Sequence, residues 1–293
     1  MKTDHSTKIF EQNRPQLFRL AYGMLGRVAP AEDAVQEAFL RWQKIDTDSI
    51  KSAGAYLSTI VSHICLDEIK SARNRREQYI GPDLPEPLLE TDSHTPEEST
   101  ELADSLSMAL LVVLKKLTPV QRAVFILHEI FDYDYSHISG IINKPETNCR
   151  KIAQRAREQV GQNKPRFKPA EEQHHRLVKL FIDAVKNGQT SELENMLAED
   201  AVFYSDGGGK VTSAGKPIKG FQKITRFMMG IRKKAPEETH FEFRNVNGQP
   251  GVVAYIGDNL HSVWSFFIEE GKIRNIYVVL NPEKLEHLKK RAV

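Results

Sequence analysis

The spacing of apolar side chains along the chain changes once, near residue 170. Before that point they recur at steps of three and four residues, the period of a helix with one buried face. Over 31–42 this stripe includes Ala31, Val35 and Trp42, and Pro30 suits the first helical turn, where its missing N–H is not needed. A second stripe over 55–76 runs out into basic residues. We therefore expect residues 8–76 to be helical.

Residues 77–103 have no usable periodicity. They include four prolines and many carboxylates, and no Lys or Arg occurs from Glu77 to Leu114. Proline favours extended backbone and like charges repel, so this composition predicts an extended linker between domains.

Helical periodicity returns over 104–162, and several residues there indicate where helices start and end. Thr118 and Pro119 make a good helix start. A short helix over 135–142 is expected to end at Asn143, a residue that tolerates the left-handed conformation of a tight turn. Pro145 then opens a long basic helix. A helix, a short turn and a helix rich in Arg, Lys, Asn and Gln predict a helix-turn-helix.

The second of these helices has the side chains that read bases. Asn and Gln can pair with adenine and Arg with guanine, while the other cations neutralise phosphates. The alternative is a solvated charged helix, but cap, turn and basic face agree on the motif. The positions expected to face DNA are Glu146, Thr147, Asn148, Arg150, Lys151, Gln154 and Arg155. Cys149, Ile152, Ala153 and Ala156 are expected to be buried.

From residue 170 onwards, helical and alternating segments are mixed. Helices are expected over 175–188, 193–200 and 220–234, and a short terminal one begins at Pro282. Strands are expected over 201–206, 240–246, 251–257, 261–271 and 272–280. This order predicts an α+β domain of about 120 residues with a curved antiparallel sheet.

The net charge of +2 conceals a segregation of sign. Basic clusters over 70–76 and 144–168 flank the acidic segment, which suggests two contacts with a polyanion. The two cysteines, Cys65 and Cys149, form no metal-binding spacing, so we expect buried thiols, no metal and no cofactor. No apolar run has membrane length, so we expect a cytoplasmic protein that does not contact a membrane.

The stretch YSDGGGK (204–210) resembles a phosphate-binding loop only superficially. A Walker loop requires GxxxxGK followed by Ser or Thr, whereas here Val211 follows the lysine and the neighbours are strands. Three glycines permit positive φ and close backbone approach, so we expect a sharp turn against another surface, fixed by Asp206 and Lys210.

Several motifs taken together resemble one protein family. The helices over 31–44 and 59–76 and the helix-turn-helix segment over 135–158 resemble bacterial sigma factors of the extracytoplasmic-function (ECF) group. LPEP (84–87), DGGGK (206–210) and NPEKL (281–285) resemble the subgroup with a SnoaL-like extension of the NTF2-like superfamily. This chain has Asp83 where the subgroup usually has an aromatic residue, and Glu283 where it has Asp.

The resemblance implies a multidomain fold: two all-α helical domains, the second a helix-turn-helix, followed by an α+β NTF2-like, SnoaL-like cone-shaped domain. The implied boundaries are a sigma region 2-like domain over 8–76, the acidic linker over 77–103, a region 4-like domain over 104–162, and the SnoaL-like domain over 170–293.

The resemblance also implies partners, namely core RNA polymerase and promoter DNA. Contacts with the polymerase would come from Glu32, Asp33, Gln36, Glu37 and Arg41. Contacts with the downstream promoter element would come from Tyr56, His63, Lys70, Arg73, Arg75 and Arg76, and the upstream element would meet the basic helix listed above. Regulatory contacts would come from Leu84, Pro85, Glu86, Pro87, Asp206, Gly207, Gly208, Gly209, Lys210, Asn281, Pro282, Glu283, Lys284 and Leu285.

NTF2-like domains also form a conical pocket, which implies a small-molecule ligand. Its candidate groups are Tyr204, Asp206, His240, Tyr255, His261, Trp264 and Tyr277. No acid and base pair of fixed spacing is identifiable, so we expect no catalysis. Two other classes stay open: a helix-turn-helix regulator with a ligand-binding domain, and an NTF2-type isomerase or hydrolase.

Overall fold

The computed structural model describes residues 2–45, 50–76, 79–89, 106–161 and 171–289. They form two compact units. The helical unit contains residues 1–78 and 111–163, and the α+β unit contains residues 79–110 and 164–293. Residues 79–89 therefore belong with the C-terminal part of the chain. The predicted division into four segments remains a prediction.

The helical unit is built from α1 (Lys2–Leu25), α2 (Val28–Trp42), α3 (Ala53–Arg76), α5 (Met108–Leu114), α6 (Pro119–Phe125), the π-helical turn η2 (Ile126–Ile130), α7 (Tyr135–Ile142) and α8 (Glu146–Gly161). The unit boundary falls within α5. The stripe predicted for 31–42 is buried at Ala31, Val35 and Trp42, and α3 buries Leu57 and Val61. The core of the helical unit therefore lies where the three- and four-residue spacing of apolar side chains predicts it.

The residues predicted to start and end the helices around the helix-turn-helix lie at helix ends in the structure. Thr118 caps α6 in a capping box with Gln121, and Pro119 follows it. Asn143 ends α7 with a φ of 50°, in the left-handed region. Because Asn tolerates that conformation, the chain reverses within three residues and α8 begins at Glu146.

Polar contacts join α3 to α7 and to the turn before α7. Ser58 Oγ and Tyr133 Oη lie 2.7 Å apart, and His63 Nε2 lies 2.7 Å from the carbonyl oxygen of Ile141. The buried Arg122 donates from Nη1 to the carbonyl oxygen of Met24 in α1, at 2.8 Å. Carbonyls at a helix C-terminus lack intrahelical partners, so Arg122 satisfies an acceptor that α1 leaves open.

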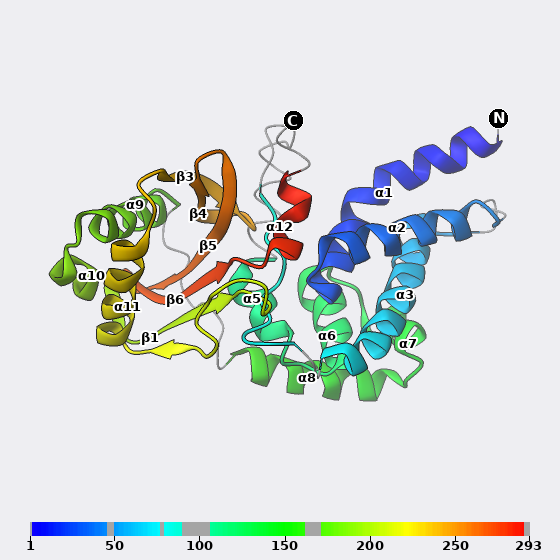
Figure 1. Ribbon diagram of the computed structural model, residues 1–293. Helices are drawn as coiled ribbons and strands as arrows, with labels where there is room; N and C mark the ends of the chain where they lie inside the picture. The colour runs from blue at the N-terminus through cyan, green and yellow to red at the C-terminus, as the bar shows by residue number, and fades with distance from the viewer. Residues whose placement is uncertain (1, 46–49, 77–78, 90–105, 162–170, 290–293) are drawn as a thin grey trace. The chain divides into compact units, whose positions relative to one another are not determined.

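The α+β unit contains α9 (Glu171–Asn187), α10 (Thr190–Met196), α11 (Phe221–Lys234) and α12 (Pro282–Lys289). Its six strands are β1 (Leu197–Asp206), β2 (Ile218–Lys219), β3 (Thr239–Val246), β4 (Gln249–Ile256), β5 (Asn259–Glu269) and β6 (Lys272–Val279). Helices α9, α10 and α11 lie together (Figure 1), and their apolar side chains share one core with the sheet. This is the expected α+β arrangement.

Two details differ from the predictions. The helix expected over 193–200 ends at Met196, and residues 197–200 begin β1. The sheet, in the order β2-β1-β6-β5-β4-β3, is not wholly antiparallel, because β1 and β6 pair in parallel. Their pairing runs from Leu197 opposite Ile273 to Asp206 opposite Val279. The parallel pair arises because the chain leaves β1, forms α11 and the other strands, and returns in β6 beside β1.

Candidate functional site

The predicted polymerase-binding face lies on the solvent side of α2. Glu32, Asp33, Gln36 and Arg41 are exposed, and Glu37 is half-buried. Arg41 Nε lies 2.9 Å from Glu37 Oε1, one helical turn away. This face therefore presents carboxylates next to one paired cation.

The residues predicted to contact the downstream element lie along α3 with different surroundings. Tyr56 is exposed and its ring lies 6.3 Å from that of Trp42, and Lys70 pairs with Asp67 at 3.1 Å. His63 is occupied by its contact with Ile141 of α7. Arg73, Arg75 and Arg76 lie on the last turns of α3, and their side chains are outside the described part.

The predicted base-reading face of α8 is open to solvent. All seven predicted residues are exposed, whereas Cys149, Ala153 and Ala156 are buried and Ile152 is half-buried. Arg150 lies 5.1 Å from the ring centre of Tyr135 in α7 and pairs with Glu146 at 3.4 Å. The helix thus keeps its small apolar residues inward and its polar ones outward.

The three short motifs, far apart in sequence, come together in the α+β unit. DGGGK begins at the last residue of β1, and NPEKL follows β6. Because β1 and β6 are parallel neighbours, their carboxyl ends meet at one edge of the sheet. The backbone N–H groups of Leu280 and Asn281 both donate to the carbonyl oxygen of Asp206, at 2.8 Å. LPEP reaches the same edge from residues 79–89, which we call the strap.

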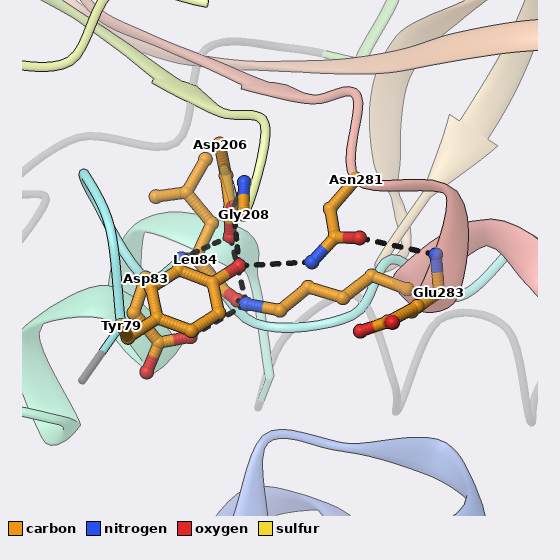
Figure 2. Close-up of polar contacts among 8 residues, drawn as sticks. Tyr79, Asp83, Leu84, Asp206, Gly208, Asn281 and Glu283 are labelled. Carbon is orange, nitrogen blue, oxygen red and sulfur yellow. Dashed lines mark hydrogen bonds and ion pairs between the residues drawn. The ribbon is translucent and has the colours of Figure 1, made fainter. Parts of the chain in front are cut away.

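Asp206 lies at the centre of this cluster (Figure 2), where it pairs with Lys284. Lys284 Nζ lies 2.7 Å from Asp206 Oδ2 and 2.5 Å from Asp83 Oδ1, and also donates to the carbonyl oxygen of Leu84. Asp206 Oδ2 accepts the backbone N–H of Leu84 at 2.8 Å, and its Oδ1 accepts the hydroxyl of Tyr79 at 2.5 Å. One buried carboxylate and one buried ammonium thus hold three strap residues.

The cluster favours a charged lysine. Burial opposes the charged ammonium of Lys284, but Asp83, Asp206 and Tyr79 outweigh it, and the pKa of Lys284 is raised. The pKa of Tyr79 is raised to about 12, mainly by burial and also by its hydrogen bond to Asp206, although the charge of Lys284 lowers it. At neutral pH Tyr79 is therefore a hydrogen-bond donor and Lys284 a cation.

The glycines of DGGGK have a packing reason. Gly208 has a φ of 59°, its N–H donates to Asp206 Oδ1 at 3.0 Å, and a Cβ there would lie 2.3 Å from Asn281 Nδ2. Only glycine combines this conformation with this approach. Asn281 Nδ2 in turn donates to Tyr79 Oη at 3.0 Å. Lys210 forms an exposed ion pair with Glu283 at 3.1 Å.

The strap is anchored again by α12 and by the end of β3. His287 of α12 contacts the carbonyl oxygen of Pro87 at 2.8 Å. Leu88 N–H donates to Asn247 Oδ1 at 3.2 Å, Asn247 N–H donates to the carbonyl oxygen of Leu88 at 2.7 Å, and Leu89 bridges Val246. Asn247 follows β3. The pairs β6–β5, β5–β4 and β4–β3 are all antiparallel, so β3 runs opposite to β6 and to its parallel neighbour β1. The strap therefore crosses the sheet.

Sequence reasoning missed Tyr79, a strap residue that Asp206 binds, and also Asn247 and His287, which contact the strap from outside it. Asn247 had a usable signal, since Asn-Gly between alternating segments predicts a tight hairpin with positive φ at both residues. Asn247 and Gly248 have φ values of 52° and 69°. Tyr79 and His287 lie outside the short motifs and had no signal of their own.

The α+β unit contains a cavity of about 1090 Å³ between the sheet and the helices. Its apolar walls are Ile182, Val185, Phe203, Ile218, Phe227, Ile231, Phe241, Ala254, Ile256, Trp264, Val278 and Leu280. His261 also lines it, so the prediction is confirmed for His261 and Trp264. Among the described residues, no Asp or Glu lines the cavity.

The prediction of pocket groups is wrong for the other five residues. Strand side chains alternate, so Phe203 and Ser205 of β1 face the cavity while Tyr204 and Asp206 face the other side. Tyr204 stacks on Tyr277 of β6, at 5.3 Å between ring centres. In the same way His240 stacks on Tyr255, at 5.1 Å, and neither lines the cavity.

Other candidate chemistry is sparse in the described ranges. Within them, no group of three or more His, Cys, Asp or Glu side chains is arranged to hold a metal ion. Cys65 and Cys149 are buried free thiols, and burial raises the pKa of both. None of the helices in the described residues combines the length and apolar character needed to cross a membrane.

Comparisons with known proteins agree with this arrangement. Residues 9–75 match the family model for sigma-70 region 2, and residues 107–160 match that for sigma-70 region 4. The chain is 31% identical to the ECF RNA polymerase sigma factor SigJ of Mycobacterium tuberculosis, over 94% of this chain and 91% of that protein. The chain belongs to the ECF RNA polymerase sigma factors. A probable ECF sigma factor, SigI of the same organism, is 30% identical over 98% of this chain and 97% of its own length.

The similarity to this ECF sigma factor family extends through the C-terminal domain. The crystal structure of M. tuberculosis SigJ superposes with a TM-score of 0.79 at 29% identity, covering 96% of this chain and 98% of that one. The resemblance to ECF sigma factors with a SnoaL-like extension is therefore confirmed, and the protein directs promoter-specific transcription initiation by RNA polymerase. Region 2 matches α1 to α3, and region 4 contains the helix-turn-helix of α7 and α8.

Proposed function

We propose that the C-terminal domain of this sigma factor regulates initiation in cis by holding the linker between regions 2 and 4. The observation that carries the proposal is the buried cluster of Lys284 and Asp206, which binds Tyr79, Asp83 and Leu84 of the strap. The strap begins three residues after α3 ends at Arg76. A sigma factor reads two promoter elements with two regions, so restraining the segment between them restrains their separation.

The surfaces that would meet the partners are also part of the proposal. The acidic face of α2 would bind a basic surface of core polymerase, where charge matching mainly sets specificity and encounter rate. The basic end of α3 would bind the downstream element and α8 the upstream element. The exposure of the predicted α2 and α8 residues supports these roles. The cytoplasm, where bacterial RNA polymerase works, is the proposed site of action.

We propose further that the C-terminal domain is not an enzyme. Enzymatic acid and base chemistry needs titratable groups within reach of a bound substrate. The described cavity lining includes His261 but no carboxylate. The buried carboxylate of Asp206 faces the opposite side of the sheet, where it accepts hydrogen bonds from Lys284 and Tyr79. Both points support a regulatory domain over an isomerase or hydrolase.

The test is reconstituted transcription with purified core RNA polymerase and a set of promoters. Wild type is compared with Lys284→Met, which breaks the cluster, and with Lys210→Met, which removes only the exposed pair with Glu283. We expect Lys284→Met to change the output at each promoter while the ranking of promoters stays the same. Lys210→Met should match wild type.

Each outcome of this test has a distinct meaning. Equal output from wild type and Lys284→Met, with an intact fold, rules out regulation through the strap. Promoter-specific binding by the protein alone, with no dependence on added polymerase, supports the ordinary helix-turn-helix regulator instead.

A further inference from the structure

The cavity of the α+β unit has an apolar interior and a cationic mouth. Its volume of about 1090 Å³ slightly exceeds the usual range for small-molecule sites, roughly 300 to 1,000 Å³. Five cationic side chains line it, namely Lys186, Lys223, Arg226, Arg232 and Lys234, and all are exposed. A ligand that matches both parts has a long apolar body and a negative end.

Three of the five cations are available for a ligand. Arg232 Nε donates to the carbonyl oxygen of Lys186 at 2.8 Å, and Lys186 Nζ lies 5.0 Å from the ring centre of Phe241. Within the described residues, Lys223, Arg226 and Lys234 have no carboxylate partner, and no carboxylate lines the cavity. Uncompensated cations at the rim of a low-dielectric cavity attract an anion, and bind it more strongly than they would in open solvent.

One loop, residues 206–214, forms a wall of the cavity and also binds the strap. On the cavity side, Thr212, Ser213 and Ala214 line the wall, and Ala214 N–H donates to Ser205 Oγ at 2.8 Å. On the other side, Asp206 and Gly208 hold Tyr79 and Leu84.

This loop is tightly packed around Gly207. The N–H groups of Lys210 and Val211 donate to the carbonyl oxygen of Gly207, at 2.9 and 3.3 Å. A Cβ on Gly207 would lie 2.7 Å from Ser213 Oγ and 2.5 Å from the carbonyl oxygen of Val211. A ligand that displaces Ser213 must therefore displace Gly207 and its neighbour Asp206, because tightly packed interiors transmit strain.

We propose that this cavity binds a single-chain amphiphilic carboxylate, with its chain between the sheet and α11 and its head at Lys223 and Arg226, and that occupancy loosens or tightens the strap through residues 206–214. The ligand site stands on the cavity itself, whereas the transmitted effect rests on the regulatory role proposed above for the strap. A neutral chain would lack the contacts at the mouth, and a short anion would leave the apolar interior unfilled.

The binding test titrates the full chain with dodecanoate, below the concentration at which it forms micelles, and follows tryptophan fluorescence and calorimetric heat. Trp264 lines the cavity and Trp42 lies in the helical unit, so Trp264→Phe should remove the fluorescence change and leave the heat. Dodecanol and acetate serve as the neutral and the short comparison. We expect saturable binding of dodecanoate, and weaker binding of the other two by about tenfold or more, which is about 1.4 kcal/mol.

Two variants locate the site. Reversing both charges in Lys223→Glu/Arg226→Glu should weaken dodecanoate binding at least about tenfold, while Lys179→Glu, an exposed cation of α9 outside the cavity, should leave it unchanged. Gly230 of α11 lines the cavity, and a Cβ there would meet nothing within 4 Å. Gly230→Phe should therefore block binding without straining the helix.

The transmitted effect is read by hydrogen exchange of residues 79–89 with and without dodecanoate. A ligand-dependent change in exchange at Leu84, absent in Gly230→Phe, supports it. No saturable binding, equal binding of dodecanol, or equal loss in Lys179→Glu overturns the ligand site. Binding without any change in strap exchange overturns the transmission. Neither measurement contains polymerase, so a failure of the transcription test leaves the binding result standing.

Discussion

The ammonium of Lys284 lies 2.7 Å from the carboxylate of Asp206, and the two side chains are 6% and 0% exposed. A second pair from the same two motifs, Lys210 and Glu283, lies 3.1 Å apart, but its side chains are 57% and 66% exposed. A buried charge that loses its partner is strongly destabilising, whereas an exposed pair is screened by water. The two lysines therefore contribute differently to the hold on the strap.

The first prediction compares the two lysines directly. Lys284→Met should lower the free energy of unfolding of the α+β unit by about 3 to 5 kcal/mol, because Asp206 and Asp83 lose their cation. Lys210→Met should lower it by at most about 1 kcal/mol. Urea unfolding of the full chain, followed by circular dichroism, measures both. Similar losses in the two variants would mean that the buried cluster is not the main anchor.

The second prediction concerns Gly208. An alanine would adopt a left-handed conformation at a cost of about 1 to 2 kcal/mol, and its Cβ would also displace Asn281 from Tyr79. Gly208→Ala should therefore speed hydrogen exchange at Leu84, whose N–H is bound by Asp206. Gly215→Ala is the matched control, because its φ is not positive and a Cβ there meets nothing within 4 Å. Unchanged exchange in Gly208→Ala would contradict the packing role.

The third prediction is a pH dependence caused by His174 of α9. Burial, followed by the nearby His175, lowers the pKa of His174 from 6.5 to about 4. Its Nε2 has no hydrogen-bond partner among the described residues. A lowered pKa in the folded state means that the unfolded chain binds the proton first, so this contribution is complete above pH 6.5 and is lost as the pH falls towards 4.

The size of this effect follows from the shift. Between pH 7 and 4, His174 should reduce the stability of the α+β unit by about 3 kcal/mol. In His174→Leu that part of the pH dependence should disappear, while the stability at pH 7 changes less. Thermal unfolding of both proteins across this range checks it, and parallel pH curves would exclude His174 as the cause.

The helical unit was largely predictable because its signals are local. Thr118, Pro119 and Asn143 fix helix ends through contacts within a few residues, and the structure has the expected cap and left-handed turn. The alternation of apolar and polar side chains in β1 was also predictable from the sequence, but it does not indicate which face of the strand borders a cavity. The sequence therefore predicts Asp206 both for the loop and for the pocket, and the structure places it on the side that binds the strap.

The candidate site depended on long-range pairing, which no local signal contains. That DGGGK and NPEKL meet follows from the parallel pairing of β1 with β6, between strands about 70 residues apart, where an antiparallel sheet was expected. Tyr79 contacts Asp206 across 127 positions of the chain. The motif resemblance indicated which residues belong together, but only the topology of the sheet explains how they meet.

The last prediction tests the DNA-reading role of α8 through Arg150. This side chain is exposed near the start of the helix, and its only contacts in the described structure are the weak pair with Glu146 and the ring of Tyr135. If it reads a base, Arg150→Ala should weaken binding to the upstream element by about 1 to 3 kcal/mol and relax the preference at one base pair.

Arg157 of the same helix provides the control for Arg150. It lies two turns further along, pairs with Glu129 at 3.6 Å and donates to the hydroxyl of Tyr135 at 3.4 Å. Arg157→Ala should therefore reduce affinity for all promoters alike or not at all, since it removes a cation but no base contact. The measurement is affinity of the polymerase holoenzyme for promoters changed one base pair at a time. Equal base preferences in Arg150→Ala and wild type would assign Arg150 to phosphate contact or to no DNA contact.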